Sequence, residues 1–283
     1  MSSNLSTIQQ TKELLKKYGI EPQKKLGQNF LVDKSAVKKL VEAGGFEKTD
    51  LVIEIGPGIG VLTKELALSA GKMIAVEKDR QMVGILSEEL ATLDIKNVEI
   101  TNRDILAFLE SGQMDGLEYK AAGNIPFYLT SHLIRILLES KNPPKDMIFI
   151  MQKEVAQRIA GNPPDMTMLS ASVQFYARPK IMGYIKRGAF WPVPAVDAAI
   201  IKITPKSVDA SIDRDLFFKI LRGGFSQPRK QLINNLSKSL KADRIKISDW
   251  LLENDIQPSR RAETLSMGEW IKLASNLPLK NII

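Results

Sequence analysis

The sequence predicts an α/β protein: a doubly wound, Rossmann-like sheet followed by a smaller, all-helical C-terminal domain. Short apolar segments alternate with helical segments between residues 51 and 151, which is typical of a parallel sheet with helices on both faces. A glycine-rich turn follows the first of these apolar segments, and after about residue 205 only helical patterns continue. We therefore expect an N-terminal basic helix and loop over residues 1–32, the sheet domain over 33–207 and the helical domain over 208–283.

The first half of the chain supplies most of the predicted strands. Residues 8–18 have the pattern of a short basic helix that ends at Gly19, and Asp33 can cap a second helix that stops at Gly44 and Gly45. Short apolar runs bounded by turn residues then predict strands at 51–55, 72–77, 98–101, 119–123 and 146–151. Helical spacing of apolar residues predicts helices between them, at 61–70, 79–92 and 131–140.

The second half changes character at a polar stretch over residues 205–212. Before it, we expect two further strands at 172–177 and 198–203, separated by a proline-rich loop over 190–197. Beyond it, helical patterns cover 213–224, 229–240, 246–253 and 267–275. The loss of strand signals at this stretch predicts the boundary between the two larger domains.

The composition excludes several kinds of chemistry. The 283 residues include no cysteine and one histidine, His132. Disulfides, thiolate metal sites, iron–sulfur clusters and thiol catalysis are therefore excluded, and we expect no metal. The polar N-terminus does not resemble a signal peptide, and no run approaches the ~18 apolar residues that span a bilayer. We expect a cytoplasmic protein with no membrane partner.

Positive charge is concentrated in one part of the chain. The formal net charge is +8, and residues 219–246 alone carry eight lysines and arginines against a single acid, Asp243. A basic surface attracts polyanions, although a run of charge can also be a solvated helix face. Because this stretch is so one-sided, we expect an anion-binding surface there, with Arg222, Arg229 and Lys230 as RNA-binding residues.

The glycine-rich turn reads EIGPGIG and contains Gly56, Gly58 and Gly60. Glycines let the backbone pass close to a ligand. In the dinucleotide fingerprint G-x-G-x-x-G the third glycine comes one residue later, and Glu54 before the first glycine does not fit that fingerprint either. The form E-x-G-x-G-x-G is found in methyltransferases that use S-adenosylmethionine (SAM), so we expect SAM as methyl donor.

Carboxylates follow the next two predicted strands. Glu77 ends the second strand, 21 residues after Gly56, which is where a carboxylate takes the ribose hydroxyls of a nucleoside ligand. Asp104 follows the third strand and could accept a hydrogen bond from the exocyclic amine of the SAM adenine, although an aspartate there can also be a helix cap. Together with the glycine turn, these residues predict a SAM site.

The fourth predicted strand runs into Asn124, Ile125, Pro126 and Phe127. Such tetrapeptides are typical of enzymes that methylate exocyclic amino nitrogens of bases. The N6 amine of adenine is a poor nucleophile because its lone pair is delocalised into the ring. The Asn124 side-chain oxygen and a backbone carbonyl, that of Ile125, can accept its N–H hydrogens, while Pro126 fixes the backbone and Phe127 can stack on a flipped base.

These motifs together resemble the small-subunit ribosomal RNA adenine-N6,N6-dimethyltransferase family (KsgA type) over nearly the whole chain. The resemblance also includes LGQNFL at 26–31, QKEVA at 152–156, FWPVPAVDAAI at 190–200 and FSQPRK at 225–230. It implies dimethylation of two adjacent adenines near the 3′ end of small-subunit (16S) rRNA during ribosome assembly. The expected SAM-binding residues are Gln28, Asn29, Leu31, Gly56, Gly58, Gly60, Glu77, Asp104, Ile105 and Asn124, with Lys24 and Lys25 as further RNA contacts.

Three other functions remain open on the sequence. A large-subunit rRNA adenine methyltransferase of the resistance type would share the sheet, the glycine turn and the tetrapeptide. A non-catalytic rRNA-binding homologue would keep the fold, but the intact candidate site argues against it. An NAD oxidoreductase is opposed by the glycine spacing. We expect the assembling small ribosomal subunit as partner and a monomeric protein.

Overall fold

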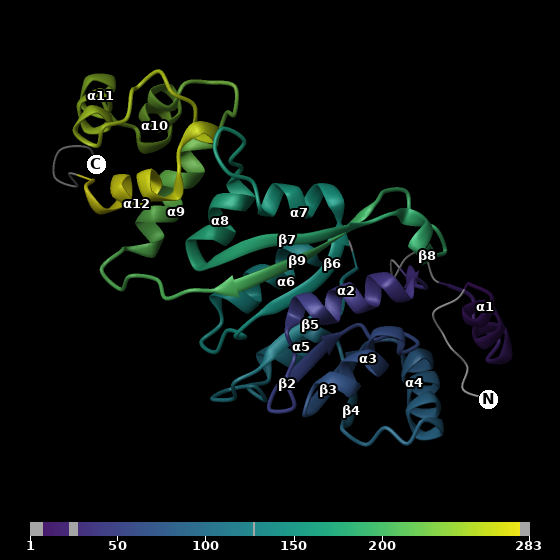
Figure 1. Cartoon of the computed structure of the whole chain (residues 1–283). Helices are drawn as coiled ribbons and strands as arrows, with labels where there is room; N and C mark the ends of the chain where they lie inside the picture. Colours follow the sequence, from purple (N-terminus) through teal and green to yellow (C-terminus); the bar gives the residue numbers. More distant parts are fainter. Residues whose placement is uncertain (1–7, 23–27, 127, 278–283) are drawn as a thin grey trace. The chain divides into compact units, whose positions relative to one another are not determined.

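The computed structural model describes residues 8–22, 28–126 and 128–277, which form two compact units (Figure 1). The first unit runs to Ala156 and resumes over Pro179–Pro205. The second comprises Gln157–Arg178 and the chain from Lys206 onward.

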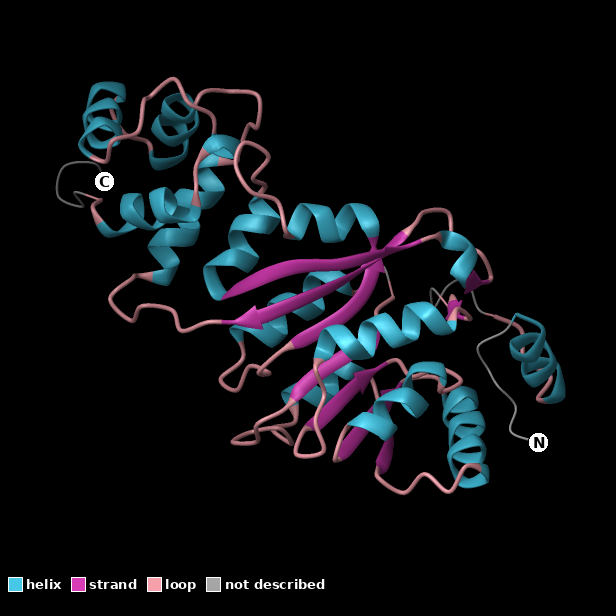
Figure 2. Cartoon of the chain, in the orientation of Figure 1, coloured by secondary structure: helices cyan, strands magenta, loops and turns pink. Residues whose placement is uncertain are grey.

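A seven-stranded sheet organises the first unit, with strand order β4-β3-β2-β5-β6-β9-β7 (Figure 2). The strands from β4 to β6 pair in parallel, whereas β9 runs antiparallel to β6. A separate two-stranded antiparallel sheet joins β1 to β8. The strands are β1 Phe30–Leu31, β2 Leu51–Ile55, β3 Lys72–Glu77, β4 Val98–Asn102, β5 Lys120–Asn124, β6 Met147–Gln152, β7 Ala177–Ile185, β8 Phe190–Trp191 and β9 Ala198–Pro205.

Helices cover both faces of this sheet, as expected for a doubly wound fold. In Figure 1, α2 and α3 lie in front of the sheet and α6 lies behind it. The helices are α1 Ile8–Lys17, α2 Lys34–Gly44, α3 Val61–Ser69, α4 Arg80–Thr92, α5 Ile105–Glu110 and α6 Thr130–Glu139, and α7 Lys153–Ile159 begins in this unit. Each predicted helix of this region is confirmed to within a residue or two.

Aspartates begin three of these helices. Asp33, Asp79 and Asp104 are the N-caps of α2, α4 and α5, and each side chain accepts a hydrogen bond from the backbone amide two residues on. Such a cap satisfies an amide that has no partner inside the helix. Gly45, with φ of 54°, ends α2 in the left-handed conformation, so both predicted signals for this helix are confirmed.

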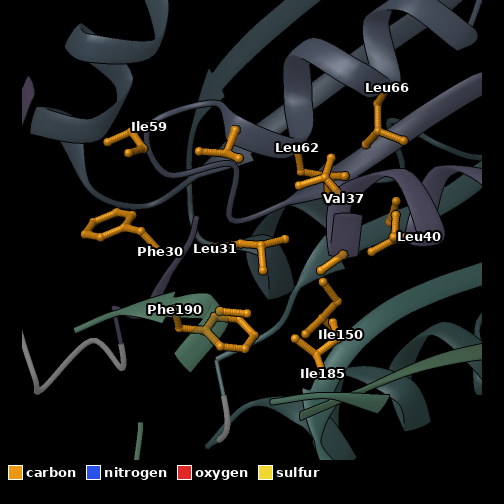
Figure 3. Close-up of a cluster of buried hydrophobic side chains, with 14 of the residues drawn as sticks. Phe30, Leu31, Val37, Leu40, Ile59, Leu62, Leu66, Ile150, Ile185 and Phe190 are labelled. Carbon is orange, nitrogen blue, oxygen red and sulfur yellow. The ribbon is translucent and has the colours of Figure 1, made fainter. Parts of the chain in front are cut away.

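The main core of the first unit lies beneath the glycine turn. Figure 3 shows apolar side chains from α2, α3 and β6 that meet those of Phe30, Leu31 and Phe190. Leu14 and Leu15 of α1 belong to the same buried cluster. Full burial of one such side chain stabilises the fold by roughly 1.5–3 kcal/mol. The N-terminal helix, expected as a separate part with its loop, therefore packs into the core of the sheet unit.

The second unit is helical and has a core of its own. Its helices are α8 Met168–Tyr176, α9 Arg214–Gly224, α10 Leu232–Leu240, α11 Arg244–Glu253 and α12 Met267–Ser275, with a 3₁₀ turn at Ala262–Thr264. Phe217, Leu236, Trp250 and Trp270 are fully buried at its centre. The Phe175 ring stacks on that of Phe217, with centroids 4.2 Å apart.

The predicted strand at 172–177 is wrong. Those residues end helix α8, which begins at the Thr167 capping box, and strand β7 starts only at Ala177. The apolar residues of the short run SVQFYA fit both the alternating spacing of a strand and the 3.6-residue spacing of a helix. In the structure, α8 places Ala171 and Phe175 in the core of the helical unit. For the same reason residues 157–178, expected in the sheet domain, group with the C-terminal helices. The antiparallel direction of β9 is a second departure from the expected parallel sheet.

In the part of the chain that the structure describes, none of the helices combines the length and the apolar character needed to cross a membrane.

Gly123 fixes how closely β5 can approach β2. A Cβ at this position would lie 2.5 Å from the carbonyl oxygen of Ile55, which is backbone and cannot rotate away. We expect Gly123→Ala to lower the free energy of unfolding by about 1–3 kcal/mol through overpacking. Gly84, in α4 with open space around it, is the matched control, and Gly84→Ala should be neutral or stabilising. Urea unfolding of both variants tests this, and equal stability of the two would contradict it.

Candidate functional site

The candidate site is a pocket at the carboxyl ends of the parallel strands. β2 lies between β3 and β5, so the loops that follow these strands diverge to opposite sides of the sheet. Ligands of doubly wound sheets bind at such a switch point. The pocket measures about 1180 Å³, open solvent at its mouth included, and lies entirely within the first unit. The predicted residues that line it are Gln28, Asn29, Leu31, Gly56, Gly58, Glu77, Asp104, Ile105, Asn124, Ile125 and Pro126.

The glycine turn forms one wall of the pocket. Gly56, Gly58 and Gly60 have φ of 67°, 56° and 84°, a region that other residues rarely adopt. A Cβ on Gly60 would lie 2.6 Å from the Leu86 side chain, and Gly60 begins α3 as its N-cap. Gly60 is not among the residues that line the pocket, so its expected contact with the cofactor stays a prediction.

Glu77 ties this turn to the end of β3. Its two carboxylate oxygens accept hydrogen bonds from the backbone amides of Gly58, at 3.1 Å, and Asp79, at 2.8 Å. Burial raises the pKa of the Glu77 carboxyl, while these two amides act in the opposite direction. Because a carboxylate has about four acceptor positions, Glu77 keeps capacity for hydroxyl donors of a ligand.

Glu54 lies below the same turn and is fully buried. Burial raises its pKa to about 8; the Thr63 hydroxyl opposes this rise and the Glu77 carboxylate adds to it. Among the described residues, nothing hydrogen-bonds to Glu54 Oε2. Glu54 is therefore protonated and uncharged at neutral pH. The sequence identified it as the acid of the glycine motif but gave no sign of its charge state.

Two hydrogen bonds bring the N-terminal segment to the pocket. The Gln28 side-chain amide donates to Asp79 Oδ2 at 3.0 Å, and the Asn124 amide nitrogen donates to the carbonyl of Asn29 at 2.9 Å. Asp79 was not among the predicted site residues, although its position just after β3 was a usable signal. These contacts bring residues 28–31, expected only from the resemblance, beside the glycine turn.

Asp104 closes another side of the pocket. Its Oδ1 caps α5, and its Oδ2 lies 3.0 Å from the Lys78 Nζ. The hydrogen bond from Lys78 lowers the pKa of Asp104 and raises that of Lys78. A ligand amine that bonds to Asp104 would share or replace this lysine. Lys78 was not predicted, because an exposed lysine after a strand carries no distinctive signal.

Asn124 ends β5 with its side chain in a defined orientation. Because Nδ2 is committed to Asn29, the amide oxygen Oδ1 remains to accept a hydrogen bond. The Ile125 amide donates to Ile150, and the Pro126 carbonyl accepts from Leu129. Phe127 lies outside the described residues, and the neighbouring Tyr128 is 65% exposed at the pocket.

The predicted RNA-binding residues of the second unit lie on and after α9. Arg222, Arg229 and Lys230 are all exposed, and no carboxylate lies within ion-pair distance of them in the described chain. The buried Asn235 side chain donates to the carbonyls of Gly224 and Gln227, so it holds the loop that carries Arg229 and Lys230. Lys24 and Lys25 lie outside the described residues. Across the described ranges, no group of three His, Asp or Glu residues could hold a metal ion.

Comparison with known proteins gives the family. A model of the family "Ribosomal RNA adenine dimethylase" matches residues 20–277. Proteins named ribosomal RNA small subunit methyltransferase A are similar at full length. That of Dehalococcoides mccartyi is 38% identical over 276 residues, or 96% of this chain and 94% of the relative. That of Geobacillus thermodenitrificans is 37% identical and covers 98% of both chains.

Solved structures agree in fold. A dimethyladenosine transferase from Plasmodium falciparum aligns with a TM-score of 0.73 at 23% identity, over 88% of this chain and 98% of that one. The 23S rRNA methyltransferase ErmE aligns with a TM-score of 0.72, also at 23% identity, over 88% of this chain and 99% of that one. At this identity the two structures show the fold alone. The family match and the full-length relatives show that the chain belongs to the ribosomal RNA adenine dimethylase family and is a SAM-dependent rRNA methyltransferase.

Proposed function

We propose that this enzyme dimethylates N6 of two adjacent adenines near the 3′ end of small-subunit rRNA while the subunit assembles. The observation that carries the chemistry is the orientation of Asn124, whose amide oxygen remains to accept while its nitrogen is held by Asn29. The names of the full-length relatives support the small subunit as substrate. The resistance-type alternative rests on the likeness to ErmE, which is one of fold alone.

The chemistry of the pocket lining suits SAM. The glycine turn leaves room for a ligand to approach the backbone, and Glu77 retains acceptor capacity for two ribose hydroxyls. Asp104 would accept from the adenine amine, with Ile105 beside it, while Gln28, Asn29 and Leu31 close the pocket over the ligand. SAM, when bound, supplies an electrophilic methyl group.

The residues at the end of β5 would then prepare the acceptor. Asn124 Oδ1 and the carbonyl of Ile125 would accept the two N–H hydrogens of the target amine, which moves electron density back onto its nitrogen. Pro126 limits the freedom of the backbone at this point. The methyl group would leave the sulfur of SAM for this nitrogen, with the sulfur keeping the electron pair of the broken S–C bond. The N6 proton, made acidic by the new N–C bond, would pass to solvent, so the site needs no strong base.

The cations of the second unit supply a surface for the RNA backbone. Burying unpaired charges is prohibitive, and their exposure without carboxylate partners suits contact with phosphates. Incubation with labelled SAM and unmethylated small or large subunits, followed by mapping of the modified bases, tests the proposed substrate. Labelling confined to large subunits would overturn it.

Glu77→Ala should weaken SAM binding by about 1.5–3 kcal/mol, the range for hydrogen bonds to a charged group. The variant also loses the acceptor for the Gly58 and Asp79 amides, so Glu77→Gln, which keeps one carbonyl oxygen, should fall between it and the wild type. Calorimetry with SAM measures both. Unchanged affinity in a folded Glu77→Ala protein would remove Glu77 from the site.

Asn124→Ala should lower the single-turnover methylation rate by about 10²–10³, by analogy with the loss of one preorganised polar group. Asn124→Asp keeps an acceptor oxygen but cannot donate to Asn29, so it should recover part of the rate. Rates are compared at saturating SAM, to separate chemistry from cofactor binding. A loss of less than about threefold in the alanine variant would mean that Asn124 has another role.

Replacing Arg222, Arg229 and Lys230 together by Ala should weaken RNA binding and flatten the plot of log affinity against log salt, because fewer counterions are released. SAM affinity should be unchanged, since the pocket lies in the first unit. The matched control replaces Lys72, Lys96 and Lys145, three exposed lysines paired with acids on the first unit. Filter binding across a salt series compares the two sets, and a wild-type slope in the first set would refute the RNA contact.

A further inference from the structure

A second hollow lies in the first unit, outside the SAM pocket. We define the β7 groove by its lining: Ile8, residues Val32–Ala36 at the start of α2, Lys39, and Tyr184–Ala189 apart from Arg187. It measures about 1250 Å³, open solvent included. Neither the proposed chemistry nor the expected RNA-binding residues use it.

The groove is basic and carries an exposed aromatic ring. Lys34, Lys39 and Lys186 are exposed, and none of them forms an ion pair among the described residues. The one carboxylate in the lining is Asp33, whose Oδ1 accepts from the Ser35 amide as the cap of α2. Three lysines thus face one acid that is already engaged in its own helix, which leaves an excess of positive charge.

Strand β7 also carries exposed basic and large apolar side chains. Because alternate residues of a strand point to one face, Lys180, Met182 and Tyr184 lie on the same side. Met182 and Tyr184 are 39% and 53% exposed. The Lys153 ammonium lies 5.2 Å from the centroid of the Tyr184 ring. Cations beside a large exposed aromatic ring form the combination that binds single-stranded nucleic acid: ammonium groups for phosphates and a ring face for a base.

The groove adjoins the SAM pocket along the small β1–β8 sheet, although the two share no lining residue. The small β1–β8 sheet contributes Leu31 and Phe190 to the pocket, and the next residues of the same two segments, Val32 and Ala189, line the groove. The Val32 amide donates to the Ala189 carbonyl at 2.8 Å, which holds the two segments together. A strand that delivers a base to the pocket could therefore continue into the groove.

We propose that the β7 groove binds single-stranded rRNA next to the target adenines, with Lys34, Lys39 and Lys186 on phosphates and Tyr184 stacked on a base. This inference rests on the proposed function, because it takes the RNA strand from that reaction. A second copy of the chain fits less well, since the same lysines would face each other across the contact. Lys180, on the edge strand β7, can also serve only to prevent pairing with another sheet, but that role does not account for Lys34, Lys39 and Lys186 or for the exposed Tyr184.

The test measures binding of an unstructured polyuridine RNA of ~12 nucleotides, within the usual site size for single strands. Replacing Lys34, Lys39 and Lys186 by Gln should lower the salt slope by up to about 2, at ~0.7 for each phosphate that is no longer neutralised. Tyr184→Ala should weaken binding about fivefold or more, and Tyr184→Phe should restore it. The control again replaces Lys72, Lys96 and Lys145, here by Gln, with the same change in net charge.

Anisotropy across a salt series gives the slopes, and photocross-linking of 4-thiouridine RNA should label the peptide that contains Tyr184. Equal slopes for the groove and control variants would overturn the inference, as would aggregation of the groove variant with unchanged RNA affinity. Methylation of small subunits is measured in parallel. A wild-type protein that methylates them while the groove variants bind RNA normally would refute the groove alone; a wild type that methylates none would refute the proposed function.

Discussion

The parallel pairing of β2 with β3 on one side and β5 on the other is the constraint on which the site depends. Ile55 lies opposite Val76, and Glu54 lies opposite both Ala75 and Ala122, so the three strands end at one level of the sheet. Gly123 has no side chain, so the end of β5 can lie close to the Ile55 carbonyl at the end of β2. The glycine turn follows the end of β2, and Glu77 and Asn124 are the last residues of β3 and β5. The pairing of the backbones therefore brings the glycine turn, Glu77 and Asn124 together, and the side chains supply the hydrogen-bonding groups of the site.

Two carboxyl groups lie next to the glycine turn, and they differ in their protonation. Glu54 lies below the turn and Glu77 beside it, and the charge of Glu77 adds to the rise in the pKa of Glu54. Glu54 is fully buried with a pKa of about 8, so it holds a proton at neutral pH. Glu77 accepts two backbone amides and is the better placed of the two to carry the charge. A protonated Glu54 therefore permits an ionised Glu77 as acceptor for a ligand.

The sequence predicted the elements that depend on local signals and missed what depends on tertiary contacts. The caps of α2 and the glycine turn can be predicted from the sequence because their residue types favour those backbone conformations. The residues at 172–177 have a length and composition that suit a strand as well as a helix. Their helical conformation goes with tertiary contacts such as the packing of Phe175 on Phe217. Lys78 and Asp79 were missed since their roles arise from partners far along the chain, Asp104 and Gln28. Phe127 and the two lysines of the N-terminal loop stay predictions.

The charge of the pocket lining differs from that of the surfaces proposed to bind RNA. The pocket lining contains three carboxylates, Glu77, Asp79 and Asp104, against two cations, Lys78 and Arg103. A phosphate would be repelled from such a lining, whereas a neutral adenine would not. Further cations with no ion pair among the described residues lie outside the pocket, in the β7 groove and, on the second unit, around α9. Under the proposed function, backbone binding and base chemistry fall on separate surfaces. Salt should therefore weaken RNA binding far more than it slows methyl transfer once the complex has formed.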